Sequence, residues 1–292
     1  MDETLSDLIE HRYADLDDVR LHYVEAGEGP LVVLLHGFPQ FWYMWRFQIL
    51  ALAEAGFRVV APDMRGYNLS EKPRGVSSYR VELLAQDVER LILACGEESA
   101  VVVGHDWGAA VAWVTAMMHP GRVKRLGILN VPHPERFARG LLRPAQLLRS
   151  SYMFFFQVPR LPEKVLAARD SAALRHTLRN ETTRLGTFAD EDIERYAEAL
   201  ARPGALTAAL NYYRALFRRN PLKARSLLRR IEAPVMVIWG ERDRFLGKEL
   251  AEPDPIWVPN LRVERLPGAS HFVAEDQPDE VNSLLIEFLR FP

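Results

Sequence analysis

The chain has 292 residues, of which 48% are hydrophobic and 26% are charged, and its formal net charge is −2. This balance is typical of a globular protein and does not favour a nucleic acid as partner. The single cysteine, Cys95, excludes an intramolecular disulfide and a cysteine-rich metal site, and its apolar surroundings indicate a buried small side chain. No run approaches the roughly 20 apolar residues that span a membrane, and the acidic N-terminus is not a secretory signal. We therefore expect a cytoplasmic protein without stable membrane insertion.

The first predicted elements are an edge ribbon and a series of buried strands. Residues 12–29, RYADLDDVRLHYVEAGEG, alternate around turn residues, which is typical of an antiparallel ribbon. Continuous apolar runs, most of them followed by a loop and a helical pattern, indicate strands covered on both faces. The fold class is therefore α/β, with a mostly parallel, doubly wound sheet. The runs are PLVVLLHGF, FRVVAPDMRGY, SAVVVGHDWG, VKRLGILNVP, APVMVIWGERD and LRVERLPGASH.

The strand pattern stops between residues 133 and 229. This stretch is rich in helix formers and arginines and has no strand pattern, as in PERFARGLLRPAQLLRS and DEDIERYAEALARPGALTAALNYYRALFRRN. The sheet pattern resumes at IEAPVMVIWG. The sequence therefore predicts a helical insertion at 133–229 between two parts of one sheet domain, 1–132 and 230–292.

Three polar residues follow predicted strands directly: Asp106 in GHDWG, Asp243 in WGERDRF and His271 in PGASHF. In open α/β sheets, functional residues gather at the carboxyl ends of the strands. Taken singly, they have structural alternatives, namely a helix cap, a turn residue and a structural histidine. Together, in the order nucleophile, acid and histidine, they predict a catalytic triad.

Asp106 stands at the centre of a Gly-x-Asp-x-Gly elbow, where a serine is usual. Gly104 and Gly108 are expected because the turn leaves no room for side chains, and the helix beginning at Trp107 favours the anion. An aspartate that attacks a saturated carbon forms an ester, which a histidine-activated water can cleave, whereas a serine would form an ether. This predicts epoxides or alkyl halides as substrates, with His271 acting in the second step.

The hydrolytic step also needs an oxyanion hole. HGFP, residues 36–39, follows the first buried strand, and we expect the backbone N–H groups of Phe38 and Trp107 to form the hole. A strand-ending turn is the alternative for HGFP, and His36 is interpreted as structural. Nearby aromatic side chains either line a lipophilic pocket or belong to the core. The pocket candidates are Phe38, Pro39, Trp42, Trp107, Phe154 and Phe155.

Opening an epoxide creates an alkoxide, so the site needs a weak acid that faces the nucleophile. Tyrosine is suited to this role because its pKa is about 10. The helical insertion offers Tyr152 in SSYMFFFQVP and Tyr213 in LNYYRALF. Either residue taken alone is as consistent with packing as with catalysis, and the sequence by itself does not bring the two together.

The chain resembles epoxide hydrolases of the α/β-hydrolase superfamily, above all the soluble type and its epoxide hydrolase 3 and 4 relatives. This resemblance implies an α/β-hydrolase fold with a helical cap, and a covalent ester formed and cleaved by the triad Asp106, Asp243 and His271. It runs almost end to end, and its specific stretches are HGFPQFWYMWRFQI, DMRGYNLSEKP, GHDWGAAVAW, NVPHP, PAQLLRSSYMFFFQVP, RPGALTAALNYYR and WGERDRF.

The resemblance also assigns the acids and marks one departure. In this family two cap tyrosines bind and protonate the epoxide oxygen, and the family motifs fall on Tyr152, five residues before Gln157, and on Tyr213 rather than Tyr212. No counterpart of the N-terminal phosphatase domain of some members is expected. Asn68, in DMRGYNLSEKP, stands where relatives more usually have glycine.

Several alternatives share parts of this pattern. Haloalkane dehalogenases use the same triad, and the indole N–H of Trp107 would suit a halide, although a halide needs no proton from tyrosines. Fluoroacetate dehalogenases hold their substrate with arginines after the nucleophile, where this chain has Trp107, Ala109 and Ala110. A serine esterase lacks its Gly-x-Ser-x-Gly here, and an inactive ligand-binding homologue is expected to have a broken triad.

We therefore expect a small lipophilic epoxide and water as partners. No cofactor, metal or nucleic acid is expected, and the chain is taken as a monomer or homodimer.

Overall fold

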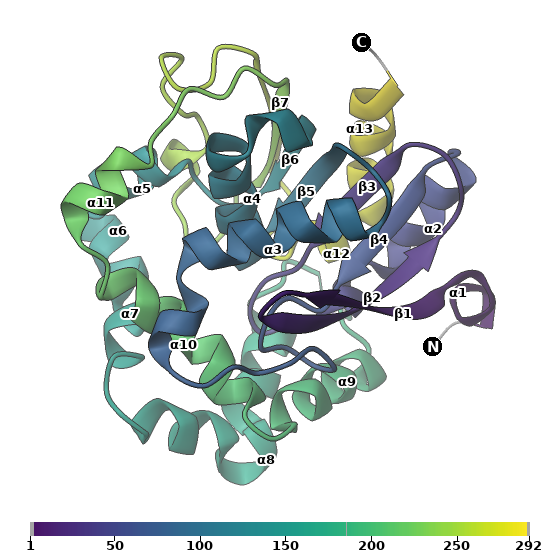
Figure 1. The fold of residues 1–292 in the computed structure, drawn as a ribbon. Coiled ribbons are helices and arrows are strands. Elements are labelled where there is room, and N and C mark those ends of the chain that lie inside the picture. The colour runs from purple at the N-terminus through teal and green to yellow at the C-terminus, as the bar shows by residue number, and fades with distance from the viewer. Residues whose placement is uncertain (1–2, 185, 291–292) are drawn as a thin grey trace.

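The computed structural model describes residues 3–184 and 186–290. Its centre is an eight-stranded sheet in the order β1-β2-β4-β3-β5-β6-β7-β8 (Figure 1). β1 and β2 form an antiparallel ribbon at one edge, β2 is also antiparallel to β4, and the other neighbours are parallel. The predicted edge ribbon and buried strands are therefore confirmed. The strands are β1 Glu10–Leu16, β2 Val19–Ala26, β3 Leu31–Leu35, β4 Arg58–Pro62, β5 Ala100–His105, β6 Val123–Leu129, β7 Val235–Gly240 and β8 Leu261–Leu266.

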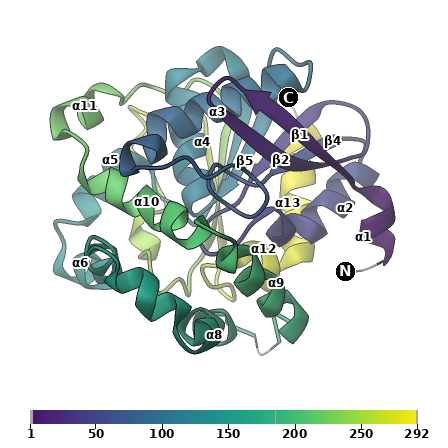
Figure 2. The same cartoon turned by 60° about the horizontal axis from the view of Figure 1, so that its bottom comes forward.

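Helices cover both faces of the sheet (Figures 1 and 2). α3 (Val81–Ala94) and α4 (Trp107–Met118) pack together on one face, and α2 (Arg46–Glu54) and α13 (Pro278–Arg290) pack together on the other. Every residue of β3, β5 and β7 is buried, which is why their sequences are continuously apolar. The shorter helices outside the insertion are α1 Glu3–Leu8, α12 Val273–Asp276 and the 3₁₀ turns Trp42–Trp45, Val76–Tyr79, Pro120–Arg122 and Lys248–Leu250.

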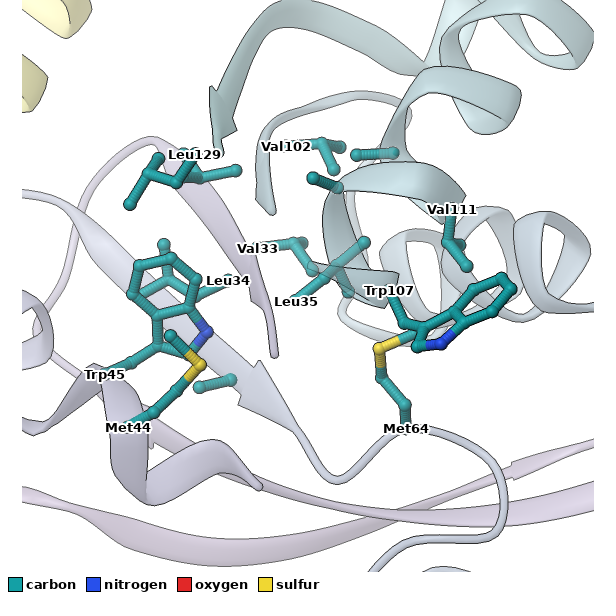
Figure 3. Close-up of a cluster of buried hydrophobic side chains, with 14 of the residues drawn as sticks. Val33, Leu34, Leu35, Met44, Trp45, Met64, Val102, Trp107, Val111 and Leu129 are labelled. Carbon is teal, nitrogen blue, oxygen red and sulfur yellow. The ribbon is translucent and has the colours of Figure 1, made fainter. Parts of the chain in front are cut away.

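The core continues through the sheet from one helix layer to the other (Figure 3). Side chains alternate along β3, so Leu34 points toward Trp45 while Val33 and Leu35 lie on the side of Trp107. Leu34 and Trp45 have no exposed surface, and Trp107 is 8% exposed. The strand that precedes the predicted oxyanion loop is thus held rigidly on both faces.

Between β6 and β7 the described residues form helices and no strands, as predicted. α8 is interrupted at residues 168–171, where Arg169, Asp170 and Ser171 have left-handed backbone conformations. Within the described part of the chain, no helix is both long and apolar enough to cross a membrane. The helices of this segment are α5 Pro134–Gly140, α6 Pro144–Arg149, α7 Ser151–Phe155, α8 Leu161–Asn180, α9 Asp190–Ala201, α10 Ala205–Phe217 and α11 Pro221–Ser226.

Asn68 lies in the loop that follows β4 and has a left-handed backbone conformation. Its φ is 38°, in the left-handed region that asparagine tolerates better than most residues. Its Nδ2 donates to Oδ2 of Asp63 at 2.9 Å, and its Oδ1 accepts from Nε of Arg202 at 2.9 Å. The asparagine therefore links this loop of the sheet domain to the segment between α9 and α10.

Candidate active site

Asp106 lies in a sharp turn between β5 and α4. Its φ of 48° and ψ of −123° lie in a region that residues other than glycine rarely adopt. A Cβ on Gly104 would come within 2.5 Å of the Gly108 backbone, and one on Gly108 within 2.0 Å of the Leu35 carbonyl oxygen. The two flanking glycines are therefore required by close backbone approach, and the strained turn exposes the carboxylate beyond the end of the sheet.

The Asp106 carboxylate contacts the two N–H groups that were predicted to form an oxyanion hole. Its Oδ1 accepts a hydrogen bond of 2.7 Å from the backbone N–H of Phe38, and the Trp107 N–H also bonds the carboxylate. A Cβ on Gly37 would lie only 2.2 Å from the Asp106 Cβ, a requirement that the sequence analysis missed. The Oδ2 atom lies 3.6 Å from Nε2 of His271.

The charge state of Asp106 follows from these neighbours. Burial by itself raises the pKa of this carboxyl group, but the hydrogen bond and the charge of His271 outweigh it and hold the pKa below its usual value of 3.8. Asp106 is therefore ionised at neutral pH, with one oxygen directed toward His271.

His271 and Asp243 form a buried pair that points at the nucleophile position. The Nδ1–H of His271 donates to Oδ2 of Asp243 at 2.7 Å, and their side chains are 6% and 1% exposed. Burial lowers the pKa of His271, but the charge of Asp243 and the hydrogen bonds to Asp106 and Asp243 raise it from 6.5 to about 10. With Asp106 ionised, His271 is therefore held as a cation between two carboxylates.

Asp243 has further partners that fix its orientation. Its Oδ1 accepts hydrogen bonds from the backbone N–H groups of Phe245 and Leu246, at 2.7 and 2.9 Å. Its Oδ2 also accepts from Nδ2 of Asn130 at 2.8 Å, and Oδ1 of Asn130 accepts from the Gly240 N–H at 2.8 Å. The sequence analysis missed Asn130, although its place directly after β6, at the same edge of the sheet, is a signal that could have found it.

Two buried histidines have supporting positions. Nε2 of His36 accepts a hydrogen bond from the Met64 N–H at 2.9 Å, and burial lowers its pKa to about 4. His36 is thus a neutral acceptor in a loop contact, consistent with the structural interpretation. His105 lies one residue before the nucleophile, and its Nε2 makes a 2.8 Å hydrogen bond to the carbonyl oxygen of His271.

Tyr152 of α7 and Tyr213 of α10 lie together at the cavity that contains Asp106 and His271. Their ring centroids are 5.9 Å apart, and the two side chains share a hydrogen bond. Burial raises the pKa of both hydroxyl groups; the next cause is the charge of Asp106 for Tyr152 and the neighbouring Tyr152 for Tyr213. Tyr212 points elsewhere, because its hydroxyl donates to the Arg65 carbonyl oxygen at 2.7 Å. Both tyrosines at the cavity are therefore protonated at neutral pH and face an anion.

The cavity has a volume of about 620 Å³ and lies between the sheet edge and the helical segment. Its lining is largely apolar, and apart from Asp106, His271 and the two tyrosines its polar groups come from α8 and from the segment from α9 to α10. The apolar lining includes Phe38, Pro39, Phe155, Phe156, Leu166, Leu174, Leu200, Leu206, Phe245 and Phe272, and the polar lining includes Glu163, Asp170, Ser171, Thr177, Arg202 and Thr207. Such a cavity suits a substrate of small-molecule size.

Three of the predicted pocket residues, Trp42, Trp107 and Phe154, do not line the cavity. Trp42 is 4% exposed and packs into the core against Phe41 and Tyr43, away from the cavity. Phe154 is 46% exposed and contacts the ring of Phe217. A helical turn has about 3.6 residues, so the face of α7 that carries Tyr152 toward the cavity carries Phe156, missed in the sequence analysis, rather than Phe154.

The side chain of Trp107 does not line the cavity either. Its ring packs edge-on against Tyr213 at 5.0 Å and Tyr212 at 5.5 Å, and it is hydrogen-bonded to Tyr213. Because an indole N–H can only donate, Tyr213 must accept this bond. The group that a halide would need is therefore already engaged by a tyrosine.

No metal-binding cluster was found within residues 3–184 and 186–290. No group of three or more His, Cys, Asp or Glu side chains there is arranged to hold a metal ion. Cys95 is a free, buried thiol whose pKa is raised by burial to about 11. This matches its interpretation as a small core side chain.

Comparisons with known proteins agree with this architecture. Residues 30–278 match the family model described as alpha/beta hydrolase fold. The chain is 42% identical to the AB hydrolase superfamily protein YfhM of Bacillus subtilis (strain 168), over 97% of this chain and 99% of that protein. It is 40% identical to epoxide hydrolase 4 of Mus musculus, over 96% of this chain and 79% of that protein.

Among solved structures, an epoxide hydrolase from Bacillus megaterium matches with a TM-score of 0.88 and 34% sequence identity, over 96% of this chain and 100% of that one. The resemblance to epoxide hydrolases inferred from the sequence is confirmed. The chain belongs to the alpha/beta hydrolase fold family.

Proposed function

We propose that this member of the family hydrolyses epoxides to vicinal diols through a covalent ester on Asp106. One observation carries the proposal: an ionised carboxylate and a pair of protonated tyrosines line the same largely apolar cavity. A nucleophile and a proton donor on one epoxide are what ring opening requires. The epoxide hydrolases of mouse and Bacillus megaterium that resemble the chain support the same activity.

In the proposed first step, Asp106 attacks one epoxide carbon. Tyr152 and Tyr213 hydrogen-bond the epoxide oxygen, and one of them donates its proton as the carbon–oxygen bond breaks. Both hydroxyl groups are protonated at neutral pH, so a proton is available when the alkoxide forms. The product of this step is an ester between the Asp106 carboxyl group and the opened substrate.

In the proposed second step, His271 activates a water molecule that attacks the ester carbonyl of Asp106. The N–H groups of Phe38 and Trp107 already contact this carboxyl group, so they would stabilise the oxyanion of the tetrahedral intermediate. Losing one such donor typically costs about 3 kcal/mol of transition-state stabilisation. Collapse of the intermediate releases the diol and restores the carboxylate.

The electrostatics of His271 connect the two steps. In the free enzyme Asp106 helps to keep the imidazole protonated. Esterification removes that charge and that hydrogen bond, so the pKa of His271 falls and its proton becomes available to restore the tyrosine. The neutral imidazole, still oriented by Asp243, is then a general base for water.

We further propose that residues 133–229 act as a cap domain on a core of residues 1–132 and 230–292. The helices of this stretch supply the two tyrosines and much of the cavity wall, whereas the sheet loops supply Asp106, Asp243 and His271. The apolar lining favours small lipophilic epoxides.

The main rival activity, dehalogenation of alkyl halides by the same triad, has less support. Halide release needs no acid, so the paired tyrosines would have no function in it. It also needs a halide donor, and the Trp107 indole is hydrogen-bonded to Tyr213. Incubation with styrene oxide and 1-bromobutane side by side separates the possibilities: diol without bromide is expected, bromide without diol would favour the rival, and neither product would favour a ligand-binding role.

A single turnover in oxygen-18 water tests the covalent step itself. With enzyme in excess, the first diol should carry no heavy oxygen, because its added oxygen comes from the Asp106 carboxylate. The label should instead enter the protein at Asp106, which peptide mass spectrometry locates. Heavy oxygen in the first diol would disprove an ester intermediate.

A further inference from the structure

One side of the helical segment exposes an unusual amount of apolar surface. Among the described residues, ten of the fourteen large hydrophobic side chains that are more than a third exposed lie between residues 142 and 222. Leu142, Leu148 and Leu222 are the most exposed of them, at 84%, 76% and 78%. A soluble surface rarely gathers such side chains in one region without a binding role.

Most of these side chains belong to helices on the same side of the molecule. Figure 1 places α6, α7, the end of α10 and α11 along one side of the molecule, and Figure 2 shows α6 and α11 on that side with the end of α10 between them. The rings of Phe154 in α7 and Phe217 at the end of α10 are in contact, with centroids 5.0 Å apart. We call this surface, from Leu142 to Val165 together with Phe217 and Leu222, the apolar–basic face.

The segments that form this face are rich in basic residues and poor in acidic residues. The sequence has no acidic residue between Glu135 and Glu163, nor between Glu198 and Glu232. These two stretches hold 13 of the 37 basic residues of the chain and none of its 39 acidic residues, although the whole chain has a net charge of −2. Arg143, Arg160 and Arg218 are exposed, and within the described residues none of them forms an ion pair. Other arginines of these stretches are paired with carboxylates outside them, as Arg214 is with Glu163 and Arg219 with Glu82. The face therefore combines protruding leucines with the three exposed arginines that form no ion pair.

We propose that the apolar–basic face docks the protein on the surface of an anionic lipid bilayer. Exposed leucine and phenylalanine side chains gain by entering the acyl boundary, while arginines beside them are attracted to anionic headgroups. This is peripheral docking, with helices lying on the membrane rather than crossing it.

Other occupants fit the face less well. A second copy of the chain in a twofold dimer would place the same positive surface against itself, and the one carboxylate of the face, Glu163, is already bound by Arg214. A nucleic acid would attract the arginines, but the most exposed side chains are leucines, which cannot hydrogen-bond to phosphate or to base edges.

The proposed docking surface adjoins the active-site cavity. Phe155 is 36% exposed on the apolar–basic face and also lines the cavity. The docking does not depend on the proposed function. If both hold, a lipophilic substrate dissolved in the bilayer would meet the cavity at the membrane surface.

Vesicle co-sedimentation tests the docking directly. We expect the protein to bind vesicles of phosphatidylcholine with about 30% phosphatidylglycerol, to bind pure phosphatidylcholine at least about tenfold more weakly, and to dissociate in about 0.5 M salt. Replacing Leu142, Leu148 and Leu222 together with serine should weaken binding by at least about tenfold. The pair Arg143→Glu and Arg218→Glu should do the same, and this pair decides the matter if the serine variant fails to fold.

Matched controls use exposed hydrophobic residues elsewhere. Leu93 and Ile256 are 44% and 62% exposed outside the face, so Leu93→Ser with Ile256→Ser should leave vesicle binding unchanged. Asp106→Ala should also bind as the wild type does, which separates docking from catalysis. Absence of binding to anionic vesicles, or equal binding by the face variants, would overturn the proposal. A dimer in light scattering that the serine variant disrupts would instead assign the face to a second copy.

Discussion

The two sides of the candidate site are held in place by different forces. On the sheet side, Asp106 and Asp243 accept hydrogen bonds from backbone N–H groups in loops that directly follow strands. On the helical side, Tyr152 and Tyr213 are held by ring packing, each against Phe156, with centroids 5.5 and 5.0 Å apart. The backbone hydrogen bonds at the sheet edge leave the two carboxylates little freedom to move. The positions of the two tyrosine rings depend instead on how α7 and α10 pack together.

Arg214 also helps to hold α7 and α10 together. Nε of Arg214 donates to the Phe156 carbonyl oxygen at 2.9 Å, and its two terminal nitrogens bind both carboxylate oxygens of Glu163 at 2.7 and 3.0 Å. Arg214 thus joins α10 to the end of α7 and the start of α8. The sheet side is suited to hold the covalent chemistry rigidly, and the helical side is suited to admit and position a substrate.

The largest expected effect is the loss of turnover in His271→Gln. It tests whether the sheet side carries out the hydrolysis step. In His271→Gln, alkylation of Asp106 should continue while hydrolysis stops, so turnover should fall by about 10³-fold or more and the ester should accumulate. Intact-protein mass spectrometry after incubation with styrene oxide should show one added substrate mass. If no adduct appears although the variant is folded, His271 does not act after the alkylation step.

Replacement of the tyrosines should have the opposite signature. Tyr152→Phe and Tyr213→Phe should each slow alkylation by about 10²-fold, since general acid catalysis commonly contributes that much, and no ester should accumulate. Rapid-mixing measurement of single turnovers gives the alkylation rate.

Tyr212→Phe is the matched control, because Tyr212 adjoins Tyr213 but bonds Arg65 outside the cavity. It should lower the free energy of unfolding by about 1 kcal/mol and leave the alkylation rate unchanged. If all three variants alkylate Asp106 at the same rate, Tyr152 and Tyr213 do not act as the acid.

The charge cluster on the sheet side should make stability depend on pH. The pKa of His271 is raised in the folded protein from 6.5 to about 10. Its contribution to stability is therefore complete below pH 6.5 and is lost as the pH rises toward 10. Between pH 7 and pH 10, urea unfolding should show the wild type losing on the order of 2 kcal/mol more than His271→Gln. Parallel curves for the two proteins would contradict the stabilised imidazolium.

The smallest expected effect concerns Asn130, which supports Asp243 without facing the substrate. Asn130→Ala removes one of the hydrogen bonds to Asp243 and the acceptor for the Gly240 N–H. We expect a loss of about 1–2 kcal/mol in the free energy of unfolding and a decrease of about tenfold in the hydrolysis step, with alkylation unchanged. Burst kinetics distinguishes the two steps, and a slower burst would place Asn130 in the first step instead.

Much of the sheet side could be predicted from the sequence, because its structure depends on patterns of neighbouring residues. A continuous apolar run predicts a buried strand, and a polar residue directly after it is carried to the common edge of a parallel sheet. Asp106, Asp243 and His271 lie together there for this reason. The Gly-x-Asp-x-Gly spacing indicates the tight turn, because only glycine leaves room for the backbone of β3 beside α4.

The helical side could be read only in part. The resemblance to a family selected Tyr213 over Tyr212, but no periodicity in α7 distinguishes the face of Tyr152 and Phe156 from that of Phe154. Trp42 was misplaced for a similar reason, because an aromatic side chain fits a core and a pocket equally well. Its place in the core depends on contacts with Phe41 and Tyr43 that only the folded structure creates.

By itself, then, the sequence determined the order of strands and helices, the sharp turn at Asp106 and the chemistry that an aspartate at this turn can perform. Only the tertiary structure decided which side chains meet across the cavity, that Asn130 supports Asp243, and that the Trp107 indole is engaged by Tyr213. The physical reason is range: turns and strands follow from neighbouring residues, whereas the position of a side chain in a cavity follows from the packing of segments far apart in the chain.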